Sequence, residues 1–253
     1  GSEMCIRDSI NQYMFRENFE PYAKAGDEVL YMCFSTGIAG TFNAANLAKE
    51  ELLEEYPEFD LTIIDTKCAS LGFGLAVEKI LRMQANGAPK DLIIEAAQFF
   101  CEHMEHIVTV ETLEYLYKGG RLSRTSAVLG GVLDLKPIIE VNDDGALVAI
   151  EKVRGRHKSL KRCVELVGER GVDLDKQIIG VVHGNDPETC EKVSAMLMEK
   201  YHCKGIIKSW VGCAIGAHTG PGIIGIVFLS ASEEKYAELS LIHISEPTRQ
   251  AEI

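Results

Sequence analysis

The residues that decide the fold read LYMCFSTGIAGTFN over positions 30–43, and a run rich in Ala, Leu and Glu continues them to position 55. The apolar start has the length of a strand, the glycines and hydroxyl side chains are typical of a turn, and the last part has helical composition. We therefore predict a strand, a loop and a helix in that order.

The first amides of such a helix lack internal partners and lie at the positive end of its dipole, so a carboxylate or a phosphate can dock there. The plainer alternative is that Ser35 and Thr36 only cap the helix.

A second unit of the same kind follows along the chain. Residues 61–66 read LTIIDT, a short and nearly all-apolar run that predicts a parallel strand covered on both faces. Residues 67–74, KCASLGFG, then lead into another helix. Because ligands collect beyond the carboxyl ends of parallel strands, we expect the two loops to face one crevice. For Asp65 two readings stand, orienting a hydroxyl group or capping the next helix.

Length and composition bound the class of protein. At 253 residues with a formal charge of −12, the chain is long enough for two modest domains and too acidic for nucleic acid, whose phosphates require a basic face. The eight cysteines form no C-x-x-C pair, which disfavours a metal site and a redox dithiol and favours a reducing cytoplasm. No apolar run approaches the ~20 residues of a membrane span, so we expect a soluble, cytoplasmic protein with at most transient membrane contact.

The later part of the chain changes character. A helix of small residues is predicted over 126–133, and residues 136–141 and 146–153 flank an Asn-Asp-Asp-Gly turn, the pattern of a β-hairpin. This switch from parallel to antiparallel structure places a domain boundary near residue 105. We expect an α/β fold of two domains, a parallel-sheet domain over 10–105 and a mixed or antiparallel α/β domain over 106–239.

Two polar clusters outside the loops have two readings each. Residues 154–158, RGRHK, are the one basic run, and they form either a solvated helix start or a docking site for a partner or a phosphate. His218 and Thr219 lie among small residues just before an apolar run, where they suit contact with a ligand. A single histidine, however, is more often a hydrogen-bonded structural group.

Taken together, six segments in this order resemble the DegV family, the bacterial fatty-acid-binding proteins that serve as binding subunits of fatty acid kinase. The resemblance extends over residues 10–239. It rests on STGIAGT at 35–41, on 65–74, on 112–123 with its Gly-Gly-Arg, on Lys-Pro-Ile at 136–138, on Arg-Gly at 154–155 and on GAHTGPG at 216–222.

The resemblance implies a carrier that binds a long-chain fatty acid and presents its carboxylate to a separate, ATP-dependent kinase subunit. On this reading the protein has no catalytic residue, no metal and no cofactor besides the fatty acid ligand. The residues implied at the ligand are Ser35, Thr36, Gly40, Thr41, Ser70, Arg121, His218 and Thr219, and those implied at the kinase-docking surface are Arg154 and Arg156.

Both ends of the chain differ from the family pattern. Residues 1–9 and 240–253 resemble translated sequencing adapters, and we expect them to be non-native flanks. Family members begin with an Asp-Ser-Thr-rich strand and carry a Thr-Ser-Gln loop at the carboxylate. We expect this part of the first domain to be missing here.

Two rival functions use the same loops. A hydrolase would employ Ser35 or Ser70 as nucleophile with His218 as base, although no Gly-x-Ser-x-Gly elbow is present. A phosphate or nucleotide binder would use the helix starts, although the loop lacks the lysine of a phosphate-binding loop.

Overall fold

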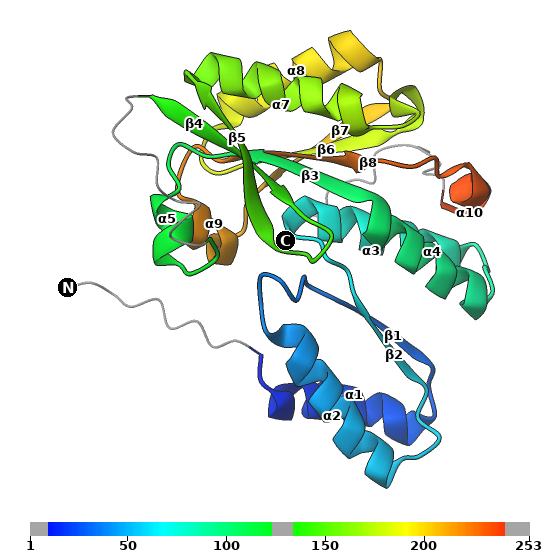
Figure 1. Cartoon of the computed structure of the whole chain (residues 1–253). Helices are drawn as coiled ribbons and strands as arrows, with labels where there is room; N and C mark the ends of the chain where they lie inside the picture. The colour runs from blue at the N-terminus through cyan, green and yellow to red at the C-terminus, as the bar shows by residue number, and fades with distance from the viewer. Residues whose placement is uncertain (1–9, 123–133, 241–253) are drawn as a thin grey trace, which may run out of the picture.

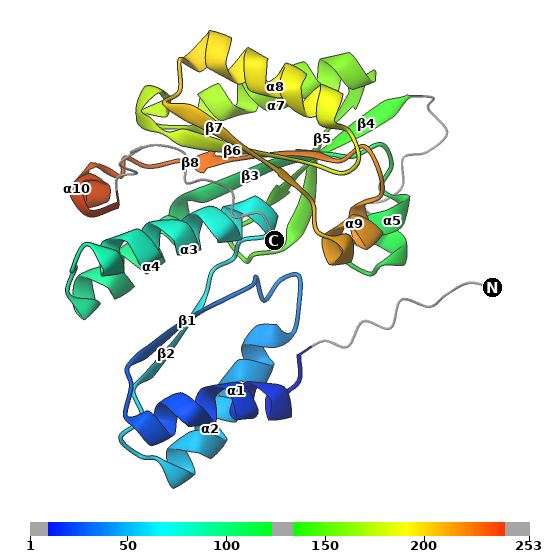
Figure 2. The same ribbon diagram turned by 180° about the vertical axis from the view of Figure 1, so that it is seen from behind.

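The computed structural model describes residues 10–122 and 134–240. The helix predicted over 126–133 and most of the two flanks lie outside these residues. Figures 1 and 2 show the described chain as a stack of layers, with a six-stranded sheet between two helical layers and a smaller two-stranded sheet with its own helices below. The predicted α/β architecture, with a parallel part followed by a mixed part, is confirmed.

The amino-terminal part holds a parallel pair of strands. Helix α1 (Gln12–Ala25) ends at Gly26, whose φ of 72° is the left-handed geometry that glycine supplies at a helix end. Strands β1 (Val29–Cys33) and β2 (Leu61–Asp65) pair in parallel register and are connected by helix α2 (Thr41–Glu55). Their carboxyl ends, Cys33 and Asp65, lie side by side, so the loops that follow them start at the same edge.

The six-stranded sheet has the order β5-β4-β3-β8-β6-β7. All its neighbouring pairs are antiparallel except β6 with β7. Its strands are β3 (Met104–Thr109), β4 (Leu135–Val141), β5 (Leu147–Arg154), β6 (Ile178–His183), β7 (Gly205–Trp210) and β8 (Ile224–Leu229).

Helices cover both faces of this sheet. Helices α7 (Arg156–Arg170) and α8 (Pro187–Tyr201) pack on one face, and α3 (Ser70–Ala85) packs on the other, with α4 (Lys90–His103) beside it (Figure 1). One apolar core joins Met32 and Ile64 of the small sheet to Val227 and Leu229 of the large one. Residues of α3 and α4 connect the two sheets within this core. Helices α3 and α4 therefore lie between the two sheets. The predicted domain limits stay a prediction.

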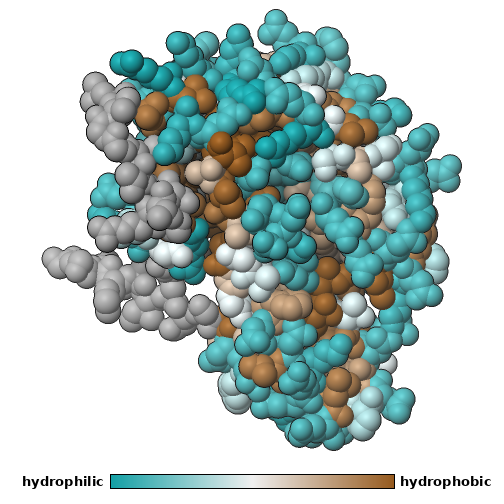
Figure 3. All heavy atoms as spheres, in the orientation of Figure 1, coloured by the Kyte–Doolittle hydropathy of each residue, from teal (hydrophilic) through white to brown (hydrophobic). Residues whose placement is uncertain are grey.

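Short helices occupy one end of the large sheet. Helix α5 (Glu114–Lys118) packs against α9 (Cys213–Thr219), and both lie near the strand ends that face the two loops (Figure 2). The described part of the chain ends with a 3-10 turn over Glu234–Tyr236 and helix α10 (Ala237–Ser240). None of the described helices is long and apolar enough to cross a membrane. Hydrophilic residues cover most of the face in Figure 3, and apolar residues show there in smaller patches.

Candidate functional site

The two loops after β1 and β2 are joined by hydrogen bonds to backbone carbonyls. The amide of Ser35 donates to the carbonyl of Cys68 at 3.2 Å, and both the amide and the hydroxyl of Thr66 donate to the carbonyl of Cys33, at 3.0 and 2.7 Å. The loops thus continue the parallel pairing beyond the last strand residues. The two loops therefore lie side by side, and that they face one crevice stays a prediction.

Asp65 connects the same two loops through its side chain. Its Oδ1 atom accepts hydrogen bonds from the amides of Thr36 at 3.1 Å and Lys67 at 3.2 Å. It caps no helix, because the residue that precedes α3 is Ala69. The capping interpretation of Asp65 was therefore wrong, and the carboxylate holds the backbone of the loop that carries Thr36.

The helix starts at these loops have no side-chain caps. Helix α2 begins after Gly40, and neither Ser35 nor Thr36 reaches its first amides, so the capping alternative for these two residues was also wrong. Helix α3 likewise begins without a side-chain cap. Uncapped amides at the start of a helix are the groups that an anion binds.

A hairpin from the large sheet reaches into the loop after β1. The buried hydroxyl of Ser35 donates to the carbonyl of Gly145 at 2.6 Å. Gly145 has a φ of 75° and lies at the turn between β4 and β5. A side chain there would overlap the Ser35 hydroxyl, and one on Gly37 would meet the Gly145 carbonyl at 2.5 Å. The contact therefore requires glycine at both positions.

The hydroxyl groups near the loops differ in whether they already take part in a hydrogen bond. Ser35 donates to Gly145, Thr219 donates to the Ile215 carbonyl at 3.1 Å, and the Thr41 hydroxyl pairs with the Cys33 thiol at 3.3 Å. Among the described residues, the hydroxyls of Thr36 and Ser70 have no hydrogen-bond partner. A hydroxyl has one proton to donate, and in the Thr41–Cys33 contact either the hydroxyl or the thiol can be the donor. Thr36 and Ser70 are therefore the hydroxyls of these loops that no contact within the described chain engages.

Arg121 links the second part of the chain to the first loop. Its Nε donates to the Ile38 carbonyl at 3.3 Å and its Nη1 donates to the Gly119 carbonyl at 2.7 Å. His218, on α9, lies against the same Gly119, because a side chain on that glycine would overlap the imidazole Nδ1. His218, Arg121 and the loop that holds Thr36 therefore form one continuous set of contacts.

Sequence reasoning missed the role of one histidine. His106 lies on β3, is 3% exposed, and its Nε2 accepts a hydrogen bond from the amide of Ala69 at 3.3 Å. Burial lowers the pKa of this imidazole to about 4, so the ring is neutral. The available signal was a polar residue near the start of an apolar strand, and that pattern alone does not distinguish a structural contact from a strand residue.

Comparison with known proteins identifies the group to which this architecture belongs. The family model described as "Uncharacterised protein, DegV family" matches residues 8–231. The chain belongs to the DegV family. A DegV domain-containing protein of Clostridium perfringens is 39% identical over 231 residues, which cover 91% of this chain and 79% of that relative. Another, from Caldanaerobacter subterraneus, is 33% identical and covers 85% of this chain and 75% of the relative.

Solved structures of DegV proteins share the fold. A DegV protein from Eubacterium eligens loaded with heptadecanoic acid superposes with a TM-score of 0.76 at 22% identity, covering 87% of this chain and 78% of that one. The fatty acid kinase B3 protein of Streptococcus pneumoniae, loaded with linoleic acid, gives a TM-score of 0.79 at 20% identity, covering 88% and 77%. A fatty-acid-binding DegV protein from Streptococcus agalactiae gives 0.74 at 27% identity, covering 88% and 77%.

An apolar groove lies next to the DegV loops. It has a volume of about 480 Å³ and is lined by β1, α3 and α4, including Leu30, Met32, Val77 and Ile80. Phe73, in the first turn of α3, lines the groove and packs on Phe34, the residue before Ser35, with ring centroids 6.4 Å apart. None of the predicted site residues lines the groove itself. Phe73 connects the groove to the loop after β1 through its contact with Phe34.

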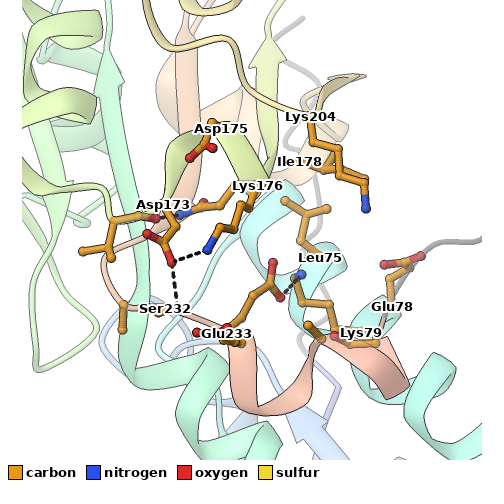
Figure 4. A pocket seen from close by; sticks show the side chains of 16 residues that line it. Leu75, Glu78, Lys79, Asp173, Asp175, Lys176, Ile178, Lys204, Ser232 and Glu233 are labelled. Carbon is orange, nitrogen blue, oxygen red and sulfur yellow. Dashed lines mark hydrogen bonds and ion pairs between the residues drawn. The ribbon is translucent and has the colours of Figure 1, made fainter.

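A second cavity, of about 510 Å³, lies on another side of α3 and has a different lining. Figure 4 shows Ser232 and Lys176 meeting Asp173, and Lys79 meeting Glu233. These charged groups satisfy one another, and no predicted site residue lines this cavity. The described residues also contain no group of three or more potential metal ligands.

The two arginines predicted at a docking surface differ in their surroundings. Arg154 ends β5 and is exposed. Arg156 begins α7, pairs through its Nε with Glu111 at 3.1 Å and donates to the Gly222 carbonyl. Lys136 joins the same carboxylate at 2.5 Å. Arg156 thus holds the end of the large sheet together, whereas the exposed side chain of Arg154 makes no ion pair or hydrogen bond with the described residues. That the two arginines contact a partner stays a prediction.

Proposed function

We propose that this protein binds a long-chain fatty acid, with the carboxylate at the two loops and the alkyl chain in the groove beside them. The observation that carries the proposal is the contact between Phe34 and Phe73, which joins a polar site to an apolar groove. An amphiphile with one anionic end matches that combination. Each buried CH₂ contributes about 0.8 kcal/mol, so the groove supplies affinity and the loops fix the head group.

Donors from both halves of the chain serve the carboxylate. The hydroxyls of Thr36 and Ser70, which have no hydrogen-bond partner in the described chain, and the uncapped amides at Gly40 and Thr41 come from the first part of the chain. Arg121 and His218 come from the second part, and Thr219 joins them only if its hydroxyl turns away from the Ile215 carbonyl. Ser35 joins them only if its hydroxyl turns away from the Gly145 carbonyl. The same hydrogen bond counts against Ser35 as a nucleophile, because its proton is directed at a carbonyl oxygen and not at an imidazole.

As a carrier, the protein would present the bound carboxylate to a separate kinase that uses ATP to form an acyl phosphate. The relative named as a fatty acid kinase B3 protein supports this role, and the exposed Arg154 suits contact with an acidic partner surface. Cytoplasmic localisation follows from that partner. It is also consistent with the seven cysteines of the described chain, all of which are unpaired.

Native mass spectrometry of the freshly purified protein, followed by lipid extraction, tests the proposal. We expect a co-purifying mass equal to that of a fatty acid, and binding of added palmitate to protein stripped of lipid. Val77→Trp should fill the groove and abolish binding. The matched variant Val172→Trp changes the second cavity and should leave binding intact.

Two results would contradict the proposal. If protein stripped of lipid binds no added fatty acid, the proposed fatty-acid-binding function is wrong. Loss of binding in Val172→Trp with retention in Val77→Trp would move the alkyl chain into the second cavity.

A further inference from the structure

The partners of His106 fix its tautomer. The ring is buried on the face of β3 that packs against α3. Its Nδ1 lies 3.1 Å from the Met104 carbonyl, which can only accept, so Nδ1 carries the proton. Its Nε2 faces the amide of Ala69, which can only donate, so Nε2 offers its lone pair. A neutral ring in this one tautomer satisfies both contacts.

The turn that His106 holds is conformationally demanding. Lys67 and Ser70 both adopt left-handed backbone geometry, with φ of 51° and 50°. Residues other than glycine are rarely found there, and they persist where surrounding contacts determine the turn from several sides. Asp65 and Thr66 bind the turn from the first sheet, and His106 binds it from the second.

The hydrogen bond from Ala69 lies immediately before Ser70. Ser70 is half-buried, and its hydroxyl has no hydrogen-bond partner among the described residues. Gly72 brings the first turn of α3 against the imidazole, because any side chain at that position would overlap Nε2. The position of the ring therefore fixes the Ala69 amide and the backbone from which the Ser70 side chain extends.

We propose that His106 is a positioning residue, whose neutral ring holds the turn before α3 so that the Ser70 hydroxyl donates to the carboxylate of the bound fatty acid. The inference rests on the proposed function and adds to it a residue that does not touch the ligand. It also assigns the large sheet a part in the geometry of the head-group site.

The test separates head-group binding from binding of the alkyl chain. Affinity is measured for palmitate and for methyl palmitate, which has the same chain and no charge. The ratio of the two affinities reports on donors at the carboxylate. Ser70→Ala should lower this ratio about tenfold, the effect of one hydrogen bond to a charged group.

Variants of His106 should act through Ser70. His106→Leu, which removes the acceptor, should lower the ratio as Ser70→Ala does, and the double variant should be no worse than either single one. His106→Gln, which restores an acceptor, should recover part of the ratio. Affinity for methyl palmitate should change little in all of these variants.

His183 provides the matched control. It is 5% exposed on β6 of the same sheet, and its Nδ1 accepts from the amide of Asp186 at 3.2 Å, so it has the same kind of contact with a different loop. His183→Leu should leave the palmitate to methyl palmitate ratio unchanged. A general loss of packing would lower both affinities in both variants.

Nitrogen NMR of the wild-type imidazoles covers the case in which His106→Leu does not fold. We expect a neutral His106 with its proton on Nδ1 at pH 7. A protonated ring, a proton on Nε2, or an unchanged affinity ratio in a folded His106→Leu would overturn the inference. Wild-type protein that binds neither lipid would overturn the proposed function instead, and the inference with it.

Discussion

The hydroxyl of Ser35 donates a 2.6 Å hydrogen bond to the carbonyl of Gly145, 110 residues later in the chain. This contact joins the loop after β1 to the turn of a hairpin in the other sheet. Its geometry leaves no room for a side chain at Gly145 and requires a left-handed backbone there. The stability of the hairpin turn and the availability of the Ser35 hydroxyl are therefore linked.

Gly145→Ala should lower the free energy of unfolding by about 2–4 kcal/mol, the sum of left-handed strain and overlap with Ser35. Gly87→Ala is the matched control, because Gly87 has nearly the same φ, 77°, and nothing within 4 Å of the added carbon. It should cost only about 1–2 kcal/mol. Urea unfolding of both variants measures the difference, and equal losses would show that the close contact is unimportant.

Thr36→Val should weaken fatty acid binding about tenfold without loss of stability, because the side chain is exposed and its hydroxyl has no hydrogen-bond partner among the described residues. Thr189→Val, on α8 in the far layer, is the control and should bind normally. Isothermal titration with palmitate gives both affinities. Normal binding by Thr36→Val would exclude this hydroxyl from the site.

Asp65→Ala should lower the free energy of unfolding by about 2–3 kcal/mol and weaken palmitate binding, because two backbone amides lose their acceptor. Asp65→Asn keeps an oxygen in the same place and should restore most of both properties. Urea unfolding and palmitate titration are measured on the same samples. A variant Asp65→Asn as damaged as Asp65→Ala would show that the charge, and not the two hydrogen bonds, is what matters.

His106 should make stability depend on pH. Its pKa falls from an ordinary value near 6.5 to about 4 on folding, so the unfolded chain binds a proton at pH values where the native ring does not. The free energy of unfolding therefore has its full value, as far as His106 is concerned, above pH 6.5. It decreases as the pH falls towards 4, by at most about 3 kcal/mol. Urea unfolding at pH 7, 5.5 and 4.5 should show a steeper loss in wild type than in His106→Gln. Parallel curves would contradict a neutral buried ring.

Arg154→Glu should slow acyl phosphate formation by a fatty acid kinase at least tenfold and leave palmitate affinity unchanged, because the side chain is exposed and lies outside the groove. Trapping the acyl phosphate with hydroxylamine measures the rate. Lys161→Glu, an equal charge change on an exposed residue of α7, is the control. Equal rates for both variants would place the docking surface elsewhere.

Much of the architecture follows from the sequence itself. Apolar runs of strand length at 30–34 and 61–66, each followed by a glycine loop and a helical run, predicted β1-α2 and β2-α3, and the turn at 142–145 predicted the β4–β5 hairpin. The motif order from 35–41 to 216–222 predicted the family. These signals are local, since strand and helix periodicity and turn chemistry are set within a few residues.

What the tertiary structure alone decided is which polar groups remain free. Sequence treated Ser35, Thr36, Thr41 and Ser70 alike, whereas packing commits Ser35 to Gly145 and Thr41 to Cys33 and leaves Thr36 and Ser70 without a partner in the described chain. The same holds for His106, whose role depends on Ala69 in another layer. A donor's availability depends on acceptors brought near it by folding from distant positions, and no local pattern in the sequence records them.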